Sequence, residues 1–138
     1  MLKNGFSNIT LIDIAPKAVA QLNEKYYQIP EVNIVFGDFF EDNGKYDLMI
    51  EQTFYCAVAP SLRKKYIVKP ASLLKDNGSF MGLLFNTSFE KQGPPFGGSI
   101  TEYRQLFETK FIIKKMDDCY NSIPSRANTE VFINLIKK

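Results

Sequence analysis

Three short apolar segments in the first half of the chain each end in a carboxylate or amide side chain. These endings are Asp13 after residues 9–12, Asp38 after residues 32–37, and Glu51 with Gln52 after residues 46–50. In a parallel α/β sheet the carboxyl ends of the strands line the ligand crevice. Acidic and amide groups gathered there suit a ligand rich in hydroxyl and amino donors, such as a nucleoside. The pattern predicts a nucleotide-type site that lacks the usual phosphate loop.

Length and composition predict one ordinary soluble domain. The chain has 138 residues, of which 45% are apolar and 23% charged, and its net charge is +2. The basic residues are scattered, and lysine pairs such as Lys114-Lys115 are too short for a nucleic-acid stripe. Residues 80–85, the longest apolar run, are far too few to cross a bilayer, and the start carries no signal peptide. We expect a cytoplasmic protein that binds neither nucleic acid nor membrane.

Cysteine and histidine content excludes several kinds of site. Cys56 and Cys119 lie far apart and form no metal-type spacing, which favours a reduced intracellular protein. The chain has no histidine. Histidine triads, histidine acid–base catalysis and histidine metal ligands are therefore excluded, and we expect no metal site.

Strands are predicted wherever short β-branched or aromatic runs occur. They cover residues 9–13, 32–36, 47–50, 79–85, 111–116 and 130–136. The last two have no helix between them, so we expect them to form an antiparallel pair. Because strands and helices alternate before that point, the predicted fold is α/β, a mostly parallel sheet with an antiparallel C-terminal hairpin.

Three helices are predicted from their start signals. Pro16 suits the first position of one helix, Ser61 the cap of a second, and Ser99 the cap of a third over residues 100–107. Glu102 would complete a capping box with Ser99. The second helix should run to about Lys75, be kinked or split at Pro70, and end at residues 76–78.

Two loop motifs of the chain are distinctive when they are taken together. The first motif is Tyr46-Asp47-Leu48-Met49-Ile50-Glu51-Gln52-Thr53-Phe54-Tyr55-Cys56-Ala57, followed by Pro60-Ser61-Leu62-Arg63. The second is Gly93-Pro94-Pro95-Phe96 followed by Glu102 and Leu106-Phe107. Both motifs resemble those of the thiopurine methyltransferase family, most closely its thiol, halide and thiocyanate branch. Pro124-Ser125-Arg126 also fits, and the resemblance runs from Gly5 to the C-terminus.

The resemblance implies an S-adenosyl-L-methionine-dependent methyltransferase with a Rossmann-like class I sheet. The residues it matches to cofactor binding are Asp13 at the ribose, with Ile14 next to it, Asp38 and Phe39 at the adenine, and Glu51 and Gln52 beside the cofactor. Those it matches to the substrate are Tyr55, Arg63 and Phe96, and residues 53–57 would flank the methyl group. It implies no acid–base catalytic residue.

Family members also carry an N-terminal helical cover, a first strand and a Gly-rich turn that this sequence lacks. In this class the first strand lies between the second and the fourth. The strands ending at Asp13 and Glu51 would then flank an empty position and leave backbone groups unpaired, at a heavy cost. We interpret the chain as one truncated methyltransferase domain, residues 1–138. The alternatives to truncation are that the sheet closes over the empty position or that a strand from a partner fills it. We expect a monomer in the intact form and leave self-association open for a truncated one.

The implied chemistry is an in-line methyl transfer to a small soft nucleophile. Such a displacement needs the nucleophile held close to the methyl group and kept from water. A thiolate, halide or thiocyanate needs little help from a base, so the lack of histidine is tolerable. Phe54, Tyr55 and Phe96 would make an apolar pocket that tolerates the cationic sulfonium.

Each candidate residue also has a plainer structural interpretation. These are Asp13 as a helix cap, Asp38 as a turn residue, Phe54 and Phe96 as core, Arg63 as part of a solvated helix face, and Cys56 as a small buried residue. Other functions stay open as well. A remnant that no longer binds cofactor could present its gapped sheet to a partner. A nicotinamide enzyme also uses an acidic residue after its second strand. A receiver-like domain ranks last, because the chain lacks the adjacent acidic pair.

Overall fold

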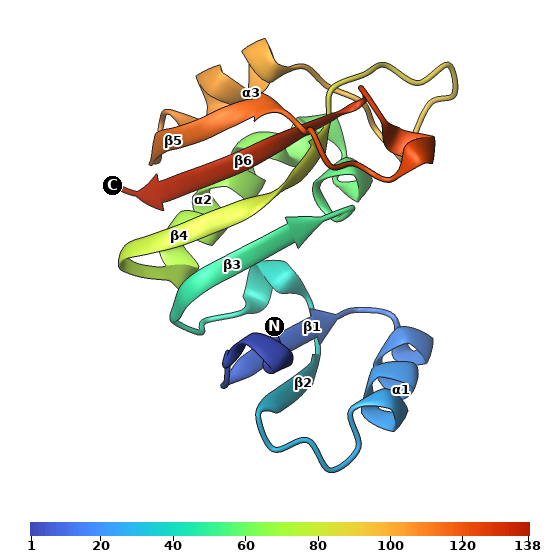
Figure 1. Cartoon of the computed structure of the whole chain (residues 1–138), viewed down its shortest axis with the longest axis vertical. Coiled ribbons are helices and arrows are strands. Elements are labelled where there is room, and N and C mark those ends of the chain that lie inside the picture. Colours follow the sequence, from blue (N-terminus) through green and yellow to red (C-terminus); the bar gives the residue numbers. More distant parts are fainter. The chain divides into compact units, whose positions relative to one another are not determined.

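The computed structural model describes all 138 residues and divides them into two compact units. The first unit is Met1–Asn43 and the second is Gly44–Lys138. Figure 1 follows the elements along the chain. None of the helices is both long enough and apolar enough to cross a lipid bilayer.

The first unit is a βαβ arrangement. Its elements are a 3-10 turn Leu2–Asn4, strand β1 Ile9–Asp13, helix α1 Pro16–Lys25, strand β2 Val32–Phe36 and a 3-10 turn Phe39–Glu41. β1 and β2 pair in parallel, with Ile9 opposite Val32 and Asp13 opposite Phe36. Both predicted strands are confirmed, and Pro16 takes the first helical position, where its missing N–H costs nothing.

The second unit holds a four-stranded mixed sheet. Its elements are strand β3 Tyr46–Gln52, 3-10 turns Tyr55–Ala57 and Pro60–Leu62, helix α2 Arg63–Leu73, strand β4 Leu74–Phe85, helix α3 Ile100–Phe107, strand β5 Phe111–Asp118, a 3-10 turn Pro124–Arg126 and strand β6 Glu130–Lys137. The strand order is β3-β4-β6-β5. β3 pairs with β4 in parallel, while β6 runs antiparallel to both of its neighbours. The α/β class and the antiparallel C-terminal hairpin are confirmed.

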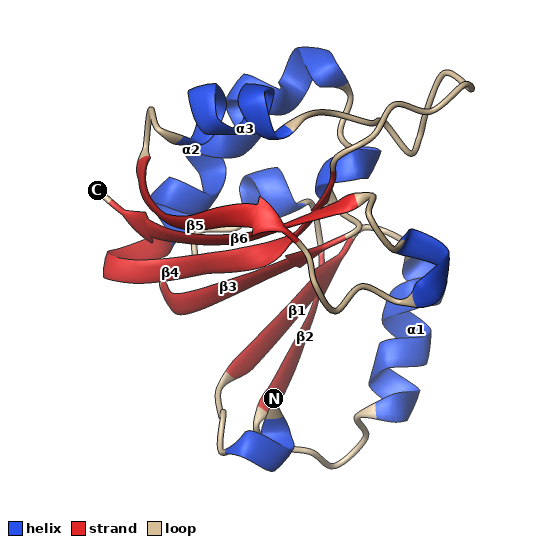
Figure 2. Cartoon of the chain, turned by 45° about the horizontal axis from the view of Figure 1, so that its top comes forward, coloured by secondary structure: helices blue, strands red, loops and turns tan.

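The core of this unit lies between the sheet and its two helices. α2 and α3 lie on the same face of the sheet (Figure 2). Alternate residues of β6 point to that face, so Val131, Ile133 and Leu135 are fully buried. The ring of Phe107 from α3 lies 6.0 Å from those of Phe80 and Phe111, centre to centre. Each such buried apolar side chain contributes about 1.5–3 kcal/mol to stability.

The boundaries of the second predicted helix are wrong at both ends. Ser61 lies in a 3-10 turn, and α2 begins at Arg63 with no side-chain cap. α2 ends at Leu73, and residues 76–78 belong to β4 instead of ending a helix. The reason is that Leu74 is fully buried and pairs with Tyr46, which draws the chain into the sheet early. Pro70 lies inside α2 without splitting it.

The strands expected to flank an empty position do not pair with each other. β1 pairs with β2 alone, and β3 pairs with β4 alone, in two separate sheets. Each of these strands therefore has a strand partner on one side only.

Candidate functional site

In the first unit, the two predicted carboxylates lie at the same end of the two-stranded sheet. The Gly37 backbone N–H, next to Asp38, donates to the Asp13 carbonyl oxygen at 3.0 Å. The Asp13 carboxylate accepts from the Ala15 N–H at 2.7 Å, in the short turn before α1. Because both strands end here in parallel, the structure brings the two acidic residues together as the alternation of elements predicts.

The Asp38 side chain also shapes the chain that follows it. Its Oδ1 accepts from the Phe40 N–H at 2.8 Å and caps the 3-10 turn Phe39–Glu41. The ring of Phe39 packs edge-on against that of Phe40, with centres 5.5 Å apart. Ile14, by contrast, is an exposed apolar residue next to Asp13. This end of the unit thus presents two carboxylates together with apolar surface.

In the second unit, Glu51 is a buried carboxylate near the end of β3, and its hydrogen bonds hold the loop that follows this strand. Its side chain accepts backbone N–H bonds from Phe54 at 2.9 Å and Tyr55 at 2.8 Å, and the Tyr66 hydroxyl donates to it at 2.6 Å. Burial raises the pKa of Glu51 above its ordinary value of 4.5, although these three hydrogen bonds oppose the shift. Gln52, the next residue, is exposed at the strand end. The Glu51 side chain therefore holds the loop in place, whereas the Gln52 side chain is exposed to solvent.

The backbones of β3 and β4 approach each other closely beside Glu51. A side chain on Gly82 of β4 would collide with the Glu51 carbonyl oxygen. Only glycine lets the two strands come so close at the point where the Glu51 carboxylate is buried.

The two loop motifs singled out from the sequence meet in the structure. The Phe96 backbone N–H donates to the Cys56 carbonyl oxygen at 2.7 Å. Arg63 places its guanidinium 5.0 Å from the centre of the Tyr55 ring. The three predicted substrate residues, Tyr55, Arg63 and Phe96, thus belong to one cluster. Tyr55 and Arg63 are nonetheless buried, at 2% and 5% exposure. The interpretation of Arg63 as part of a solvated helix face is wrong.

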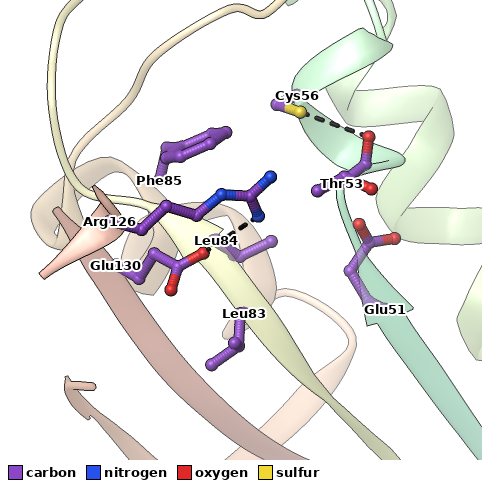
Figure 3. A pocket seen from close by; sticks show the side chains of 8 residues that line it. All are labelled: Glu51, Thr53, Cys56, Leu83, Leu84, Phe85, Arg126 and Glu130. Atoms are coloured by element: carbon purple, nitrogen blue, oxygen red, sulfur yellow. Dashed lines mark hydrogen bonds and ion pairs between the residues drawn. The ribbon is translucent and has the colours of Figure 1, made fainter. Parts of the chain in front are cut away.

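A small cavity lies at the carboxyl ends of β3 and β4. Its volume is about 10 Å³, room for about one water molecule. It is lined by Glu51, Thr53, Cys56, Leu83, Leu84, Phe85, Arg126 and Glu130 (Figure 3). Burial raises the pKa of the Cys56 thiol, and the nearby charge of Glu51 raises it further. The thiol is therefore protonated at neutral pH, and its Sγ donates to the Thr53 carbonyl oxygen at 3.2 Å.

Two further charged residues at this cavity, Arg126 and Glu130, were not singled out from the sequence as site residues. Arg126 extends across the cavity from the β6 side (Figure 3). Its guanidinium lies 5.3 Å from the centre of the Phe85 ring and pairs with the buried Glu130 carboxylate at 3.3 Å. The signal that could have found Arg126 is the spacing of an arginine and a glutamate four residues apart, with the glutamate at the first position of the last strand.

Comparison with known proteins finds a family whose sequence model matches nearly the whole chain. The sequence model of the family described as Thiopurine S-methyltransferase (TPMT) matches residues 3–136. A protein named probable thiol methyltransferase 2 from Arabidopsis thaliana is 31% identical over 100 residues, covering 69% of this chain and 44% of that protein. Thiocyanate methyltransferase 1 from the same plant is 26% identical over 125 residues, covering 86% of this chain and 55% of its own length. The chain spans about half the length of these curated relatives.

A solved structure with a similar fold supports the α/β fold described above. The crystal structure of the Burkholderia thailandensis 1,6-didemethyltoxoflavin-N1-methyltransferase, with bound 1,6-didemethyltoxoflavin and S-adenosylhomocysteine, matches with a TM-score of 0.74. The match covers 95% of this chain and 61% of that one, at 15% identity. At such low identity the likeness extends to the fold alone.

Proposed function

Because the chain belongs to the thiopurine S-methyltransferase family, we propose that it is an S-adenosylmethionine-dependent methyltransferase for a small soft nucleophile such as a thiol, halide or thiocyanate. The observation that carries this proposal is the joining of two loops at the strand ends, through the Phe96 N–H and the Cys56 carbonyl. We propose further that the two units are parts of one methyltransferase domain, since the family match runs through both of them.

The chemistry of the strand ends fits an adenosine-containing cofactor. We propose that Asp13 and Ile14 bind its ribose and that Asp38 and Phe39 bind its adenine. Carboxylates accept hydrogen bonds from hydroxyl and amino groups, and apolar side chains pack against a base. Gln52 is proposed beside the cofactor in the second unit, with Glu51 acting through the loop that it holds. When bound, the cofactor supplies an electrophilic methyl group.

The residues of the second unit suit an anionic acceptor. Arg126 places a permanent positive charge at the carboxyl ends of β3 and β4, and its side chain keeps 31% of its surface exposed. Because Glu130 pairs with this charge at 3.3 Å, we propose that Arg126 holds a thiolate, halide or thiocyanate through the guanidinium N–H groups that this pairing leaves unused, rather than through a net positive field. Phe54 and Phe96 offer apolar surface that keeps water away from the nucleophile. A halide or thiocyanate arrives already charged, and a thiol releases its proton to solvent before the thiolate attacks, so no residue of the chain has to remove a proton.

The test is binding of S-adenosylhomocysteine, followed by backbone amide NMR of this chain. We expect weak binding, with a Kd in the millimolar range or about −4 kcal/mol. The amides that shift should include those of Gly37, Asp38 and Gln52. Asp38→Asn should weaken the shifts while its amide oxygen keeps the cap on the following turn.

Asp117→Asn, on an exposed part of β5, is the matched control and should leave binding unchanged. The absence of any shift at millimolar ligand would contradict the cofactor assignment. Micromolar binding would contradict the expectation that this form binds weakly. Shifts confined to residues outside the strand ends would contradict the assignment of Asp38 and Gln52.

The alternative is a non-catalytic interaction module with the same fold. The observation that favours it is that β3 has a strand partner on one side only. An open strand edge can pair with another chain, which would give such a module its binding surface.

A further inference from the structure

We propose that Arg63 is a positioning residue, which fastens the loop of residues 86–99 to helices α2 and α3, and that it does not contact the methyl acceptor. This inference rests on the proposed function, because the loop carries Phe96, a proposed part of the acceptor site. It departs from the expectation drawn from the family resemblance, in which Arg63 lies near the substrate.

The first observation is that both ends of the Arg63 guanidinium are engaged within the protein. Nη1 donates to the Glu102 carboxylate on α3 at 2.6 Å, and Nη2 donates to the Gly97 carbonyl oxygen in the loop at 2.6 Å. The planar fork of a guanidinium suits two acceptors side by side, and charge-assisted bonds of this length are strong. One side chain thus ties the start of α2 to α3 and to the loop.

The second observation is that Arg63 is closed off from a small molecule in solution. Only 5% of its surface is exposed, and its guanidinium lies against the face of the buried Tyr55 ring. The third nitrogen, Nε, is buried as well and has no hydrogen-bond partner. An acceptor could reach this group only if Tyr55 or the loop moved. The Glu102 carboxylate also pairs with the charge that would have attracted an anion.

The third observation is the place where Arg63 grips the loop. At Gly97 the two limbs of the loop come together, since a side chain there would collide with the Thr87 carbonyl oxygen. The Gly98 N–H also donates to the Thr87 carbonyl oxygen, at 3.0 Å. The Arg63 bond therefore holds the narrow neck of the loop, one residue beyond Phe96. Loss of this bond should free the neck and with it the position of Phe96.

The experiment measures opening of the loop with trypsin in the native state, without cofactor or acceptor. Lys91 lies exposed within the loop, and Lys114 lies within the edge strand β5, where cleavage requires this strand to detach from β6. In Arg63→Met the rate of cleavage at Lys91 relative to Lys114 should rise about tenfold, because opening no longer breaks two charge-assisted bonds. In Arg63→Lys this ratio of cleavage rates should rise as well, because an ammonium lacks the planar fork that reaches both acceptors.

A second variant and a control make the result specific. Glu102→Ala should also raise cleavage at Lys91, and the double variant should be no faster than the faster single variant, because both remove the same link. Arg104→Met is the matched control, since Arg104 also lies on α3 but donates to the Met116 carbonyl oxygen at 2.7 Å. It should leave the ratio within about twofold of the unchanged protein.

Three results would overturn the proposal. The first is a ratio of Lys91 to Lys114 cleavage in Arg63→Met that stays within twofold of the unchanged protein. The second is cleavage at Lys91 in Arg63→Lys that is as slow as in the unchanged protein. The third is an equal change of the ratio in Arg63→Met and Arg104→Met. Because no ligand is present, loop protection can follow the proposal even if S-adenosylhomocysteine fails to bind. Failure of the proposed function and failure of this inference are therefore distinguishable.

Discussion

At the scale of single residues, Glu51 shows how a charged side chain can be retained in a core. It is 4% exposed, yet three protein donors reach its two oxygens. Removing the carboxylate would leave two backbone N–H groups and the Tyr66 hydroxyl without this acceptor. Glu51→Ala should therefore cost about 2–4 kcal/mol of folding free energy.

The pH dependence of stability should carry the signature of Glu51. Since burial raises its pKa in the folded state above the ordinary 4.5, the folded protein holds this proton at a pH where the unfolded chain has released it. The contribution is most favourable at about pH 4.5 and below, and is lost as pH rises through the folded pKa. Glu51→Gln should remove this loss and flatten the decline of stability toward neutral pH, as measured by urea unfolding.

Asp47→Asn serves as the control for that experiment, because Asp47 lies on the same strand but its side chain is 82% exposed. Its stability profile should follow that of the unchanged protein. If Glu51→Gln declined with pH as steeply as the control, the buried carboxylate would not be the source.

The same scale shows why sequence predicts some site positions and not others. Asp13 and Asp38 follow strands whose composition is clear, so their place at the strand ends could be predicted. Arg63 could not be placed in this way. Its neighbours Lys64 and Lys65 suggest a solvated face, while its partners Gly97 and Glu102 lie 34 and 39 residues away in the chain. The binding roles of these residues stay predictions.

At the scale of elements, two serines that looked alike in the sequence behave differently. Ser99 caps α3, because its Oγ accepts from the Glu102 N–H at 3.3 Å, whereas Ser61 lies in a 3-10 turn and caps nothing. The Glu102 carboxylate pairs with Arg63. Ser99→Ala should therefore cost about 1 kcal/mol in urea unfolding.

Ser61→Ala is the natural comparison for this measurement and should change stability by less than about 0.5 kcal/mol. Equal costs for the two substitutions would mean that the cap on α3 contributes nothing of its own. Local sequence signals located the start of α3 correctly, because cap and helix lie side by side in the chain. They failed at α2, where pairing of Leu74 with Tyr46 determines the helix end.

At the scale of the whole molecule, the two edges of the four-stranded sheet differ in character. β5 carries Lys114, Lys115, Asp117 and Asp118, and charges of this kind discourage pairing with another chain. β3, at the opposite edge, exposes 57% of Ile50. Sedimentation velocity should therefore detect concentration-dependent self-association of the chain through β3.

The two edges also provide a matched pair of variants. Ile50→Lys should shift the association to at least about tenfold higher protein concentration, because a charge on an edge strand opposes pairing. Ile112→Lys, at an isoleucine of β5 with 48% exposure, should leave it unchanged. A chain that stays monomeric at all accessible concentrations would contradict the expectation, and so would equal effects of the two variants.

Strand alternation in the sequence was enough to predict the α/β class and the C-terminal hairpin. It was not enough to predict the two compact units, because nothing in the composition changes at Asn43 and Gly44. The insertion of β6 between β4 and β5 depends on pairing between strands far apart in the chain. Local patterns carry little information about such pairing.

The position of β6 has a consequence for how a nascent chain acquires its structure. Translation produces β5 before β6, yet β6 is the strand that joins β5 to β4. Until β6 has left the ribosome, residues 111–118 have no neighbour within the sheet to pair with. The lysines and aspartates of that strand should oppose its pairing with other chains during this interval, when a purely apolar strand would be most prone to aggregate.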